Sequence, residues 1–179
     1  LRSQGITDVG VQQIAGNLTD NYNSGNKLLS LSEATAQSTS VAAIGVAAHE
    51  CGHAVQDAKN YFPLKLRAAI VPVANIGSTL SFPLIMLGVI MSWNQTLINV
   101  GILAFSLALV FQLVTLPVEF DASRRALSIL REGNMLAEDE LAAARKVLMA
   151  AALTYVAAAL ATFLQLLRLV LLFGNRSRD

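Results

Sequence analysis

The most extended pattern in the chain is a pair of apolar runs without charge. Residues 71–93 and 96–118 contain no Asp, Glu, Lys or Arg, and each is long enough to cross the hydrocarbon core of a bilayer, which needs about 20 helical residues. Two residues separate the runs, which predicts a tight hairpin of two membrane spans, with Trp93 at an interface. A pair of buried core helices is the alternative, but soluble helices seldom lack charge over such lengths.

A third apolar run follows a charged segment. Residues 119–146 predict helices that are broken at the sequence "REGN" and restart with acidic residues first and basic residues last, as the helix dipole favours. Residues 147–173 predict a third, tilted span, in which the side chain of Arg168 reaches toward the interface. The remaining residues, 174–179, form a short polar tail.

The first 70 residues have mixed polarity and predict a small membrane-surface part. Two short strands flank a cluster of turn formers, which predicts a hairpin or a pair of edge strands within residues 11–31. The later strand, around residues 26–32, could pair with an extended substrate backbone. A helix should begin after the cap candidates Ser38, Thr39 and Ser40 and end before Pro63.

These patterns predict a mainly α protein: a membrane-embedded helical bundle with a small α+β subdomain made of a short β-hairpin and the helix after residue 40. The predicted parts are residues 1–70, the two-span hairpin 71–118, the surface helices 119–146, the span 147–173 and the tail 174–179. The chain starts with Leu1 inside what reads as a polar helix. We therefore expect the native N-terminus to lie upstream.

Composition and charge support a membrane protein. Hydrophobic residues make up 54% of the chain and charged residues 14%, against about 25% charged residues in soluble domains. A net charge of +1 gives no reason to expect a nucleic-acid partner, and a single cysteine excludes an internal disulfide framework.

The distribution of basic residues predicts the orientation. The loop between the first two spans has no charge, whereas the segments on the other side of the membrane are basic, so the positive-inside rule places those segments in the cytoplasm. The basic residues concerned are Lys59, Lys65, Arg67, Arg124, Arg125, Arg131, Arg145 and Lys146. The two arginines of the tail conflict with this rule if residues 147–173 fully cross; we expect them to cross.

The candidate chemistry lies in the sequence "HECGH", residues 49–53, which holds both histidines of the chain. Residues four apart share one face of a helix, so His49 and His53 can bind one ion. Neutral imidazole is a common zinc ligand, and Glu50 beside it can take a proton from a water molecule activated by the metal. The spacing is typical of zinc metalloproteases. Two ordinary hydrogen-bonded helix histidines are the alternative.

A catalytic zinc site needs a third protein ligand and an open coordination position. Because no third histidine exists, the ligand must be a carboxylate, and the candidates are Glu119 and Asp121. Pro117 should end the second span and Glu119 should open the next helix, on the membrane face where the histidines lie. We therefore favour Glu119 as the ligand, and expect Asp121 to orient a histidine through its second ring nitrogen.

Three segments carry a family resemblance: "SVAAIGVAAHECGHAVQDAKNYFPLKLRAAIVPVANIGS", "TLPVEFDASRRAL" and "AAALTYVAAAL". Together they resemble the YugP-like neutral zinc metallopeptidases of bacterial membranes. The resemblance implies zinc ligands at His49, His53 and Glu119, a general base at Glu50, and a further N-terminal membrane helix, giving four spans. The site is also similar to the more distant HtpX-type and CAAX-prenyl membrane proteases. Those proteins have aspartate where this chain has Ser123, so the orienting role passes to Asp121 or is absent.

The function expected from these features is that of an integral-membrane zinc endopeptidase of the bacterial cytoplasmic membrane, with its active site on the cytoplasmic side. Its substrates would be peptides or proteins, membrane proteins among them. Something must also stabilise the oxyanion of the transition state, and the candidates are Tyr22, Arg124, Arg125 and Tyr155. A membrane scaffold that keeps a zinc site without important protease activity is the alternative. A transporter is disfavoured, because ionisable residues within the spans are nearly absent.

Overall fold

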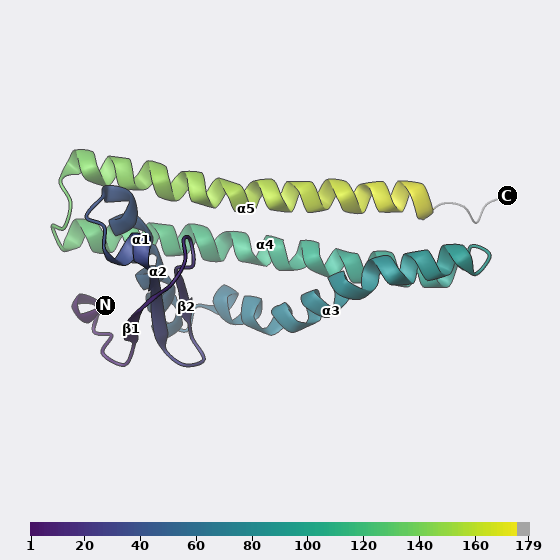
Figure 1. Cartoon of the computed structure of the whole chain (residues 1–179), viewed down its shortest axis with the longest axis horizontal. Coiled ribbons are helices and arrows are strands. Elements are labelled where there is room, and N and C mark those ends of the chain that lie inside the picture. The colour runs from purple at the N-terminus through teal and green to yellow at the C-terminus, as the bar shows by residue number, and fades with distance from the viewer. Residues whose placement is uncertain (175–179) are drawn as a thin grey trace. The chain divides into compact units, whose positions relative to one another are not determined.

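The computed structural model describes residues 1–174, which are mainly helical, with one small sheet, as expected (Figure 1). The chain divides into two compact units: unit 1 comprises Leu1–Lys65 and Pro117–Leu153, and unit 2 comprises Leu66–Leu116 and Thr154–Asp179. The elements are, in order, η1 (Arg2–Gln4), β1 (Gly10–Ile14), β2 (Asn21–Asn23), β3 (Leu28–Ser32), α1 (Glu33–Ala36), α2 (Val41–Ala58), α3 (Phe62–Ile90), α4 (Gln95–Glu132) and α5 (Glu138–Phe173).

The sheet of unit 1 has three strands in the order β1-β3-β2. A hairpin does form, but between β2 and β3, which pair antiparallel, while β1 lies parallel to β3. Part of the predicted turn is therefore a strand. The turn itself is shorter, because the side-chain oxygen of Asn23 accepts hydrogen bonds from the backbone N–H groups of Gly25 and Asn26, at 2.9 and 3.4 Å.

This topology corrects the expectation that the strand around residues 26–32 is an edge that binds substrate. β3 is the central strand, and its backbone groups pair with β1 on one side and β2 on the other. A substrate backbone can add only to an edge with unpaired groups. The two edges of this sheet are β1 and β2.

Helix α2 begins and ends as its local sequence dictates. Ser40 is the N-cap, and its hydroxyl accepts a hydrogen bond from the backbone N–H of Ala43 at 3.2 Å, which confirms it among the cap candidates. At the other end Asn60 takes the left-handed conformation, with φ of 53°, and the N–H of Tyr61 returns to the carbonyl of Gln56. The helix therefore presents residues 49–56 in regular helical register.

A close backbone contact joins α2 to α4 within unit 1. A Cβ atom on Gly52 would collide with the backbone of Ala122, so the two helices can approach this closely only because residue 52 is glycine. Gly45, two turns earlier, has more room, since its Cβ would meet only the Cβ of Ala144 at 3.8 Å. Beside these contacts lies a core cluster of buried apolar side chains: Ala48, Ala126, Leu130, Leu141 and Leu148.

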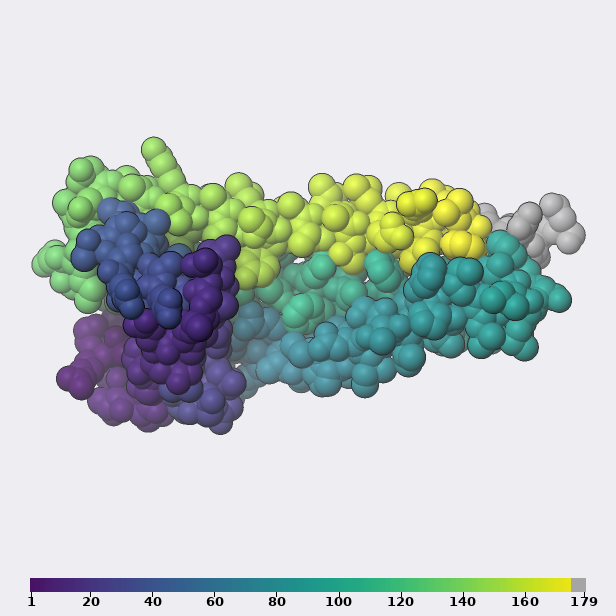
Figure 2. Space-filling view, viewed as in Figure 1, coloured from purple at the N-terminus to yellow at the C-terminus, as the bar shows by residue number. Residues whose placement is uncertain are grey.

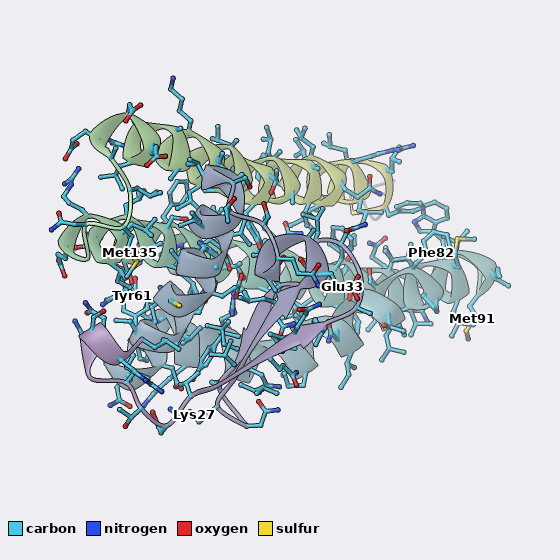
Figure 3. All side chains as sticks on the ribbon, turned by 60° about the vertical axis from the view of Figure 1, so that its left-hand side comes forward. Lys27, Glu33, Tyr61, Phe82, Met91 and Met135 are labelled. Atoms are coloured by element: carbon cyan, nitrogen blue, oxygen red, sulfur yellow. The ribbon has the colours of Figure 1, made fainter. Side chains whose placement is uncertain are left out.

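A half-buried ion pair ties the sheet to α2. Asp57 accepts hydrogen bonds from Lys27 and from the hydroxyl of Tyr22, both at 2.7 Å. Partial burial alone would raise the pKa of Asp57, but these two donors outweigh it and lower the pKa below its ordinary value. In Figure 2 the N-terminal segment, purple to blue, covers the face of unit 1 toward the viewer, and Figure 3 labels Lys27 beside the sheet.

Unit 2 contains the apolar stretches of the three long helices, which are long and apolar enough to cross a membrane. Small residues let α3 and α4 pack closely: a Cβ on Gly77 would meet the carbonyl of Ala104, and one on Gly101 the carbonyl of Ser81. Large apolar side chains such as Phe82 and Met91 are exposed (Figure 3), as expected of a lipid-facing surface. Of the predicted tail, 174–179, only Gly174 lies among the described residues.

Pro117 does not end the helix of the second predicted span, contrary to expectation. Pro117 lies inside α4, which continues without a break to Glu132. Proline removes only one backbone donor, and such losses are tolerated in membrane helices. The hydroxyl of Thr115 donates to the carbonyl of Phe111 at 2.8 Å just before it. Glu119 therefore lies within a continuous helix rather than at a new N-terminus.

The substitution Gly52→Ala should destabilise unit 1 by about 1–3 kcal/mol, because the added methyl group overpacks the contact with Ala122. Gly45→Ala is the matched control: it fits without collision and should hold or raise stability, since alanine is the better helix former. Thermal unfolding of both variants in the same detergent measures the difference. Equal stability of the two variants would contradict the close contact.

Candidate metal centre

Three side chains converge in unit 1 on a space suited to a metal ion. His49 and His53, four residues apart on α2, meet Glu119 of α4, and one ligand atom from each lies within 4.8 Å of the others. The Nε2 atoms of His49 and His53 lie 3.1 and 3.7 Å from Oε2 of Glu119. The two rings are nearly perpendicular, with centroids 4.7 Å apart.

The second nitrogen of each imidazole is held by a neighbouring side chain. Nδ1 of His49 lies 3.1 Å from the hydroxyl of Ser123, and Nδ1 of His53 lies 3.0 Å from Oε1 of Gln56. Partners of this kind hold a metal-binding histidine in one orientation and one tautomer. Both Nε2 atoms therefore point to the side on which Glu119 lies.

The hydrogen bonds of Gln56 determine the tautomer of His53. Gln56 is fully buried, and its Nε2 donates to the carbonyl of Val118 at 2.8 Å and to Asp121 at 3.0 Å. Its Oε1 therefore faces His53 as an acceptor, which requires the proton of the ring on Nδ1. The Nε2 atom of His53 is left with a lone pair directed at the carboxylate of Glu119.

Asp121 continues the hydrogen-bond network of His53 and Gln56 toward two arginines. It accepts a hydrogen bond from Arg124 and one from Arg125, both at 2.6 Å. Burial alone would raise the pKa of Asp121, but the hydrogen bonds from Arg125, Gln56 and Arg124 outweigh it, so the pKa lies below its ordinary value. An ionised Asp121 keeps the amide of Gln56 oriented. The guanidinium of Arg125 also lies over the ring of Tyr61, which Figure 3 labels, 5.6 Å from its centroid.

The donor set fits a divalent metal ion such as zinc. Glu119 is 3% exposed, and its burial would raise its pKa, yet the hydrogen bond from His49 helps to lower the pKa below its ordinary value. Its carboxylate therefore stays ionised. An ionised oxygen facing the bare lone pair of His53 repels it unless a cation lies between them. Two imidazole nitrogens and one carboxylate oxygen are the protein ligands of a common class of catalytic zinc site.

Two further residues of the sequence "HECGH" have different environments. Glu50 is buried, with 8% of its surface exposed, and lies on α2 directly after His49. Cys51 packs against a small apolar cluster that includes Ile6, Val55 and Ile129. Burial raises the pKa of the Cys51 thiol, which favours the neutral form. Cys51 therefore packs as a small apolar side chain.

The remaining predicted site residues differ in their contacts with the two histidines. Ser123 touches His49 directly, whereas Asp121 reaches His53 only through Gln56. The hydroxyl proton of Tyr22 is donated to Asp57. Tyr155 belongs to unit 2, and its role stays a prediction.

Gln56 is the residue that the sequence reasoning missed. Its spacing offered a signal: it follows His53 by three residues and so shares its helix face. A polar amide on the face that carries the ligands, in a helix otherwise rich in small apolar residues, requires buried partners.

Comparison with known proteins shows the family to which the chain belongs. Residues 1–174 match the model of a family described as "Putative neutral zinc metallopeptidase". The chain is 46% identical over 171 residues to "Putative membrane protease YugP" of Bacillus subtilis (strain 168), an alignment that covers 96% of this chain and 76% of that protein. No solved structure matches. The chain, with its cluster of two histidines and a glutamate, belongs to this family of neutral zinc metallopeptidases.

Proposed function

We propose that the protein is an integral-membrane zinc endopeptidase in which Glu50 acts as the general base. The observation that carries this proposal is the convergence of His49, His53 and Glu119, with the second nitrogen of each ring already held by another side chain. A site that only stabilises the fold is closed by four protein ligands, whereas a catalytic site keeps one coordination position open. Three candidate ligands gather here among the described residues.

Each residue then has a defined role in peptide hydrolysis. A bound zinc ion would polarise the substrate carbonyl and lower the pKa of water. Glu50 takes the proton from the attacking water and delivers it to the leaving amine. Ser123 and Gln56 hold the rings of His49 and His53, so that little reorganisation is needed during the reaction. A scaffold that merely kept the metal would not need a buried carboxylate at position 50.

The oxyanion of the transition state also needs a hydrogen-bond donor. Arg124 is the best placed of the predicted candidates for contact with a substrate, because its side chain is 80% exposed while it also bonds Asp121. Arg125 is more enclosed, at 21%, and lies over Tyr61. Tyr22 is the weakest candidate, since its proton is engaged by Asp57.

The membrane determines which substrates reach the site. Glu119 directly follows the uncharged run 96–118, and the helix after His53 leads into the uncharged run 71–93. The metal ligands therefore lie at the polar ends of apolar stretches. We propose that the enzyme cuts protein segments close to the bilayer surface, on the cytoplasmic side that the basic residues of these segments indicate.

Replacement of Glu50 by glutamine should abolish cleavage while leaving the metal bound. The loss should be at least about 100-fold, because general acid–base catalysis contributes about 10²–10⁴-fold. Cleavage of an unfolded reporter protein and zinc per chain are measured in parallel. Glu33→Gln, at an exposed position of α1 (labelled in Figure 3), is the matched control. Unchanged cleavage by Glu50→Gln would exclude the mechanism.

The substitution Glu119→Ala should remove most of the bound zinc, because two imidazoles alone hold the ion weakly. Metal analysis of the purified protein provides the measurement. Glu132→Ala removes an exposed carboxylate from the same helix and should leave the zinc content unchanged. Equal zinc in both variants would show that Glu119 is not a ligand.

Loss of the amide at position 56 should weaken zinc binding without removing a ligand. In Gln56→Leu the proton of His53 is no longer held on Nδ1, and zinc affinity should fall by about 10–100-fold. Competition with a chelator measures the affinity, and Gln13→Leu on exposed β1 is the control. Wild-type affinity in Gln56→Leu would contradict the orienting role.

A further inference from the structure

A cleft of about 770 Å³ lies in unit 1 between α4 and α5. Its walls combine arginines with apolar side chains, and none of the three candidate metal ligands lines it. The lining residues include Arg124 and Arg131 of α4, Arg145 of α5, and the apolar Pro117, Phe120 and Met149. Asp121 and Ser123 of the network around the histidines also line the cleft, as does the oxyanion candidate Arg124, but the proposed mechanism gives Arg131, Arg145 and the apolar side chains no role.

The arginines of the cleft carry more charge than their neighbours neutralise. Arg124 is paired with Asp121, but Asp121 also pairs with Arg125 outside the cleft, so one carboxylate serves two guanidinium groups. Within residues 1–174, neither Arg131 nor Arg145 has a carboxylate within 4.0 Å among the ion pairs found. Glu138 is the other acidic residue of the wall. The cleft is therefore suited to an anion.

The polarity of the cleft changes along its length. Pro117 lies in the last residues of the uncharged run of α4 and Phe120 just after it, and Met149 and Ala152 lie where α5 enters its own apolar run. Arg124 comes four residues after Phe120 on α4, and Arg145 comes four residues before Met149 on α5. Each step is a rise of about 6 Å away from the apolar run of its helix. One end of the cleft thus suits hydrocarbon, and the other suits a negatively charged group.

We propose that this cleft binds one anionic phospholipid, with its phosphate between Arg124, Arg131 and Arg145 and its acyl chains against Phe120 and Met149. Arginine binds phosphate through paired N–H donors, and basic clefts beside membrane helices bind acidic headgroups. A soluble acidic peptide would use the arginines but leave the apolar end in contact with water. The inference rests on the membrane placement in the proposed function and shares Arg124 with its oxyanion candidates, but lipid binding is measured without peptide hydrolysis.

Native mass spectrometry of the full chain in neutral detergent tests the proposal. The probes are phosphatidylglycerol and phosphatidylcholine with equal short acyl chains, glycerol phosphate, and an acidic peptide. We expect preferential retention of phosphatidylglycerol, and about fivefold weaker binding for each of Arg131→Gln and Arg145→Gln, the effect of one arginine near an anionic lipid. The matched control is Lys146→Gln, which removes an equal charge beside the cleft but outside its wall and should bind as wild type.

Three results would overturn the proposal. Equal weakening by Lys146→Gln would indicate a general surface charge effect. Equal competition by glycerol phosphate would indicate a site for the anion alone, and displacement by the acidic peptide at similar concentration would indicate a peptide groove. Glu50→Gln separates the two proposals, because it should keep lipid binding whether or not the protein cleaves peptides.

Discussion

The close approach of α2 and α4 at Gly52 is the contact on which the metal centre depends. Gly52 precedes His53, and its partner Ala122 lies between Glu119 and Ser123 on α4. The contact therefore brings the two histidines against the glutamate and the serine without any loop to adjust the distance. Backbone packed on backbone is stiffer than side chains in contact, because no rotamer can absorb a shift. Ligand geometry is in this way set by the helix packing.

A second constraint is the placement of polar groups within an apolar protein. Each buried polar side chain around the ligands is satisfied by the next: Gln56 bonds His53, Asp121 bonds Gln56, and two arginines bond Asp121. Such a chain is stable only when every member has its partners. It ends at Arg124, whose side chain is exposed to solvent. The negative charge of Asp121, which orients the imidazole of His53 through Gln56, is thus neutralised by an arginine at the surface, where the desolvation penalty of a charge is small.

Much of this arrangement could be predicted from the sequence because it follows local rules. Helical spacing places His49 and His53 on one face, and Ser40 is recognisable as a cap. The absence of charge over residues 71–93 and 96–118 likewise indicated membrane helices, and the structure forms helices there that are long and apolar enough to cross a membrane. Each of these inferences depends on neighbours within a few residues, where geometry is nearly fixed.

The features that escaped prediction depend on pairing between distant segments. Strand pattern alone does not say that β3 pairs with both β1 and β2, one parallel and one antiparallel, because the same alternation fits either arrangement. The spacing of Gln56 places it on the face of His53, but its buried partners Val118 and Asp121 come from another helix and are seen only in the structure.

The continuity of α4 through Pro117 links the membrane to the chemistry. If the helix ended at the proline, Glu119 would belong to a separate segment whose angle a loop could vary. Instead Glu119 shares one helix with the uncharged run that precedes it. Its side chain is therefore aimed by the same helix axis that the bilayer orients. For the proposed membrane endopeptidase, this arrangement favours a site at a fixed depth near the bilayer surface, and so a substrate selected by where its chain leaves the membrane more than by its side chains.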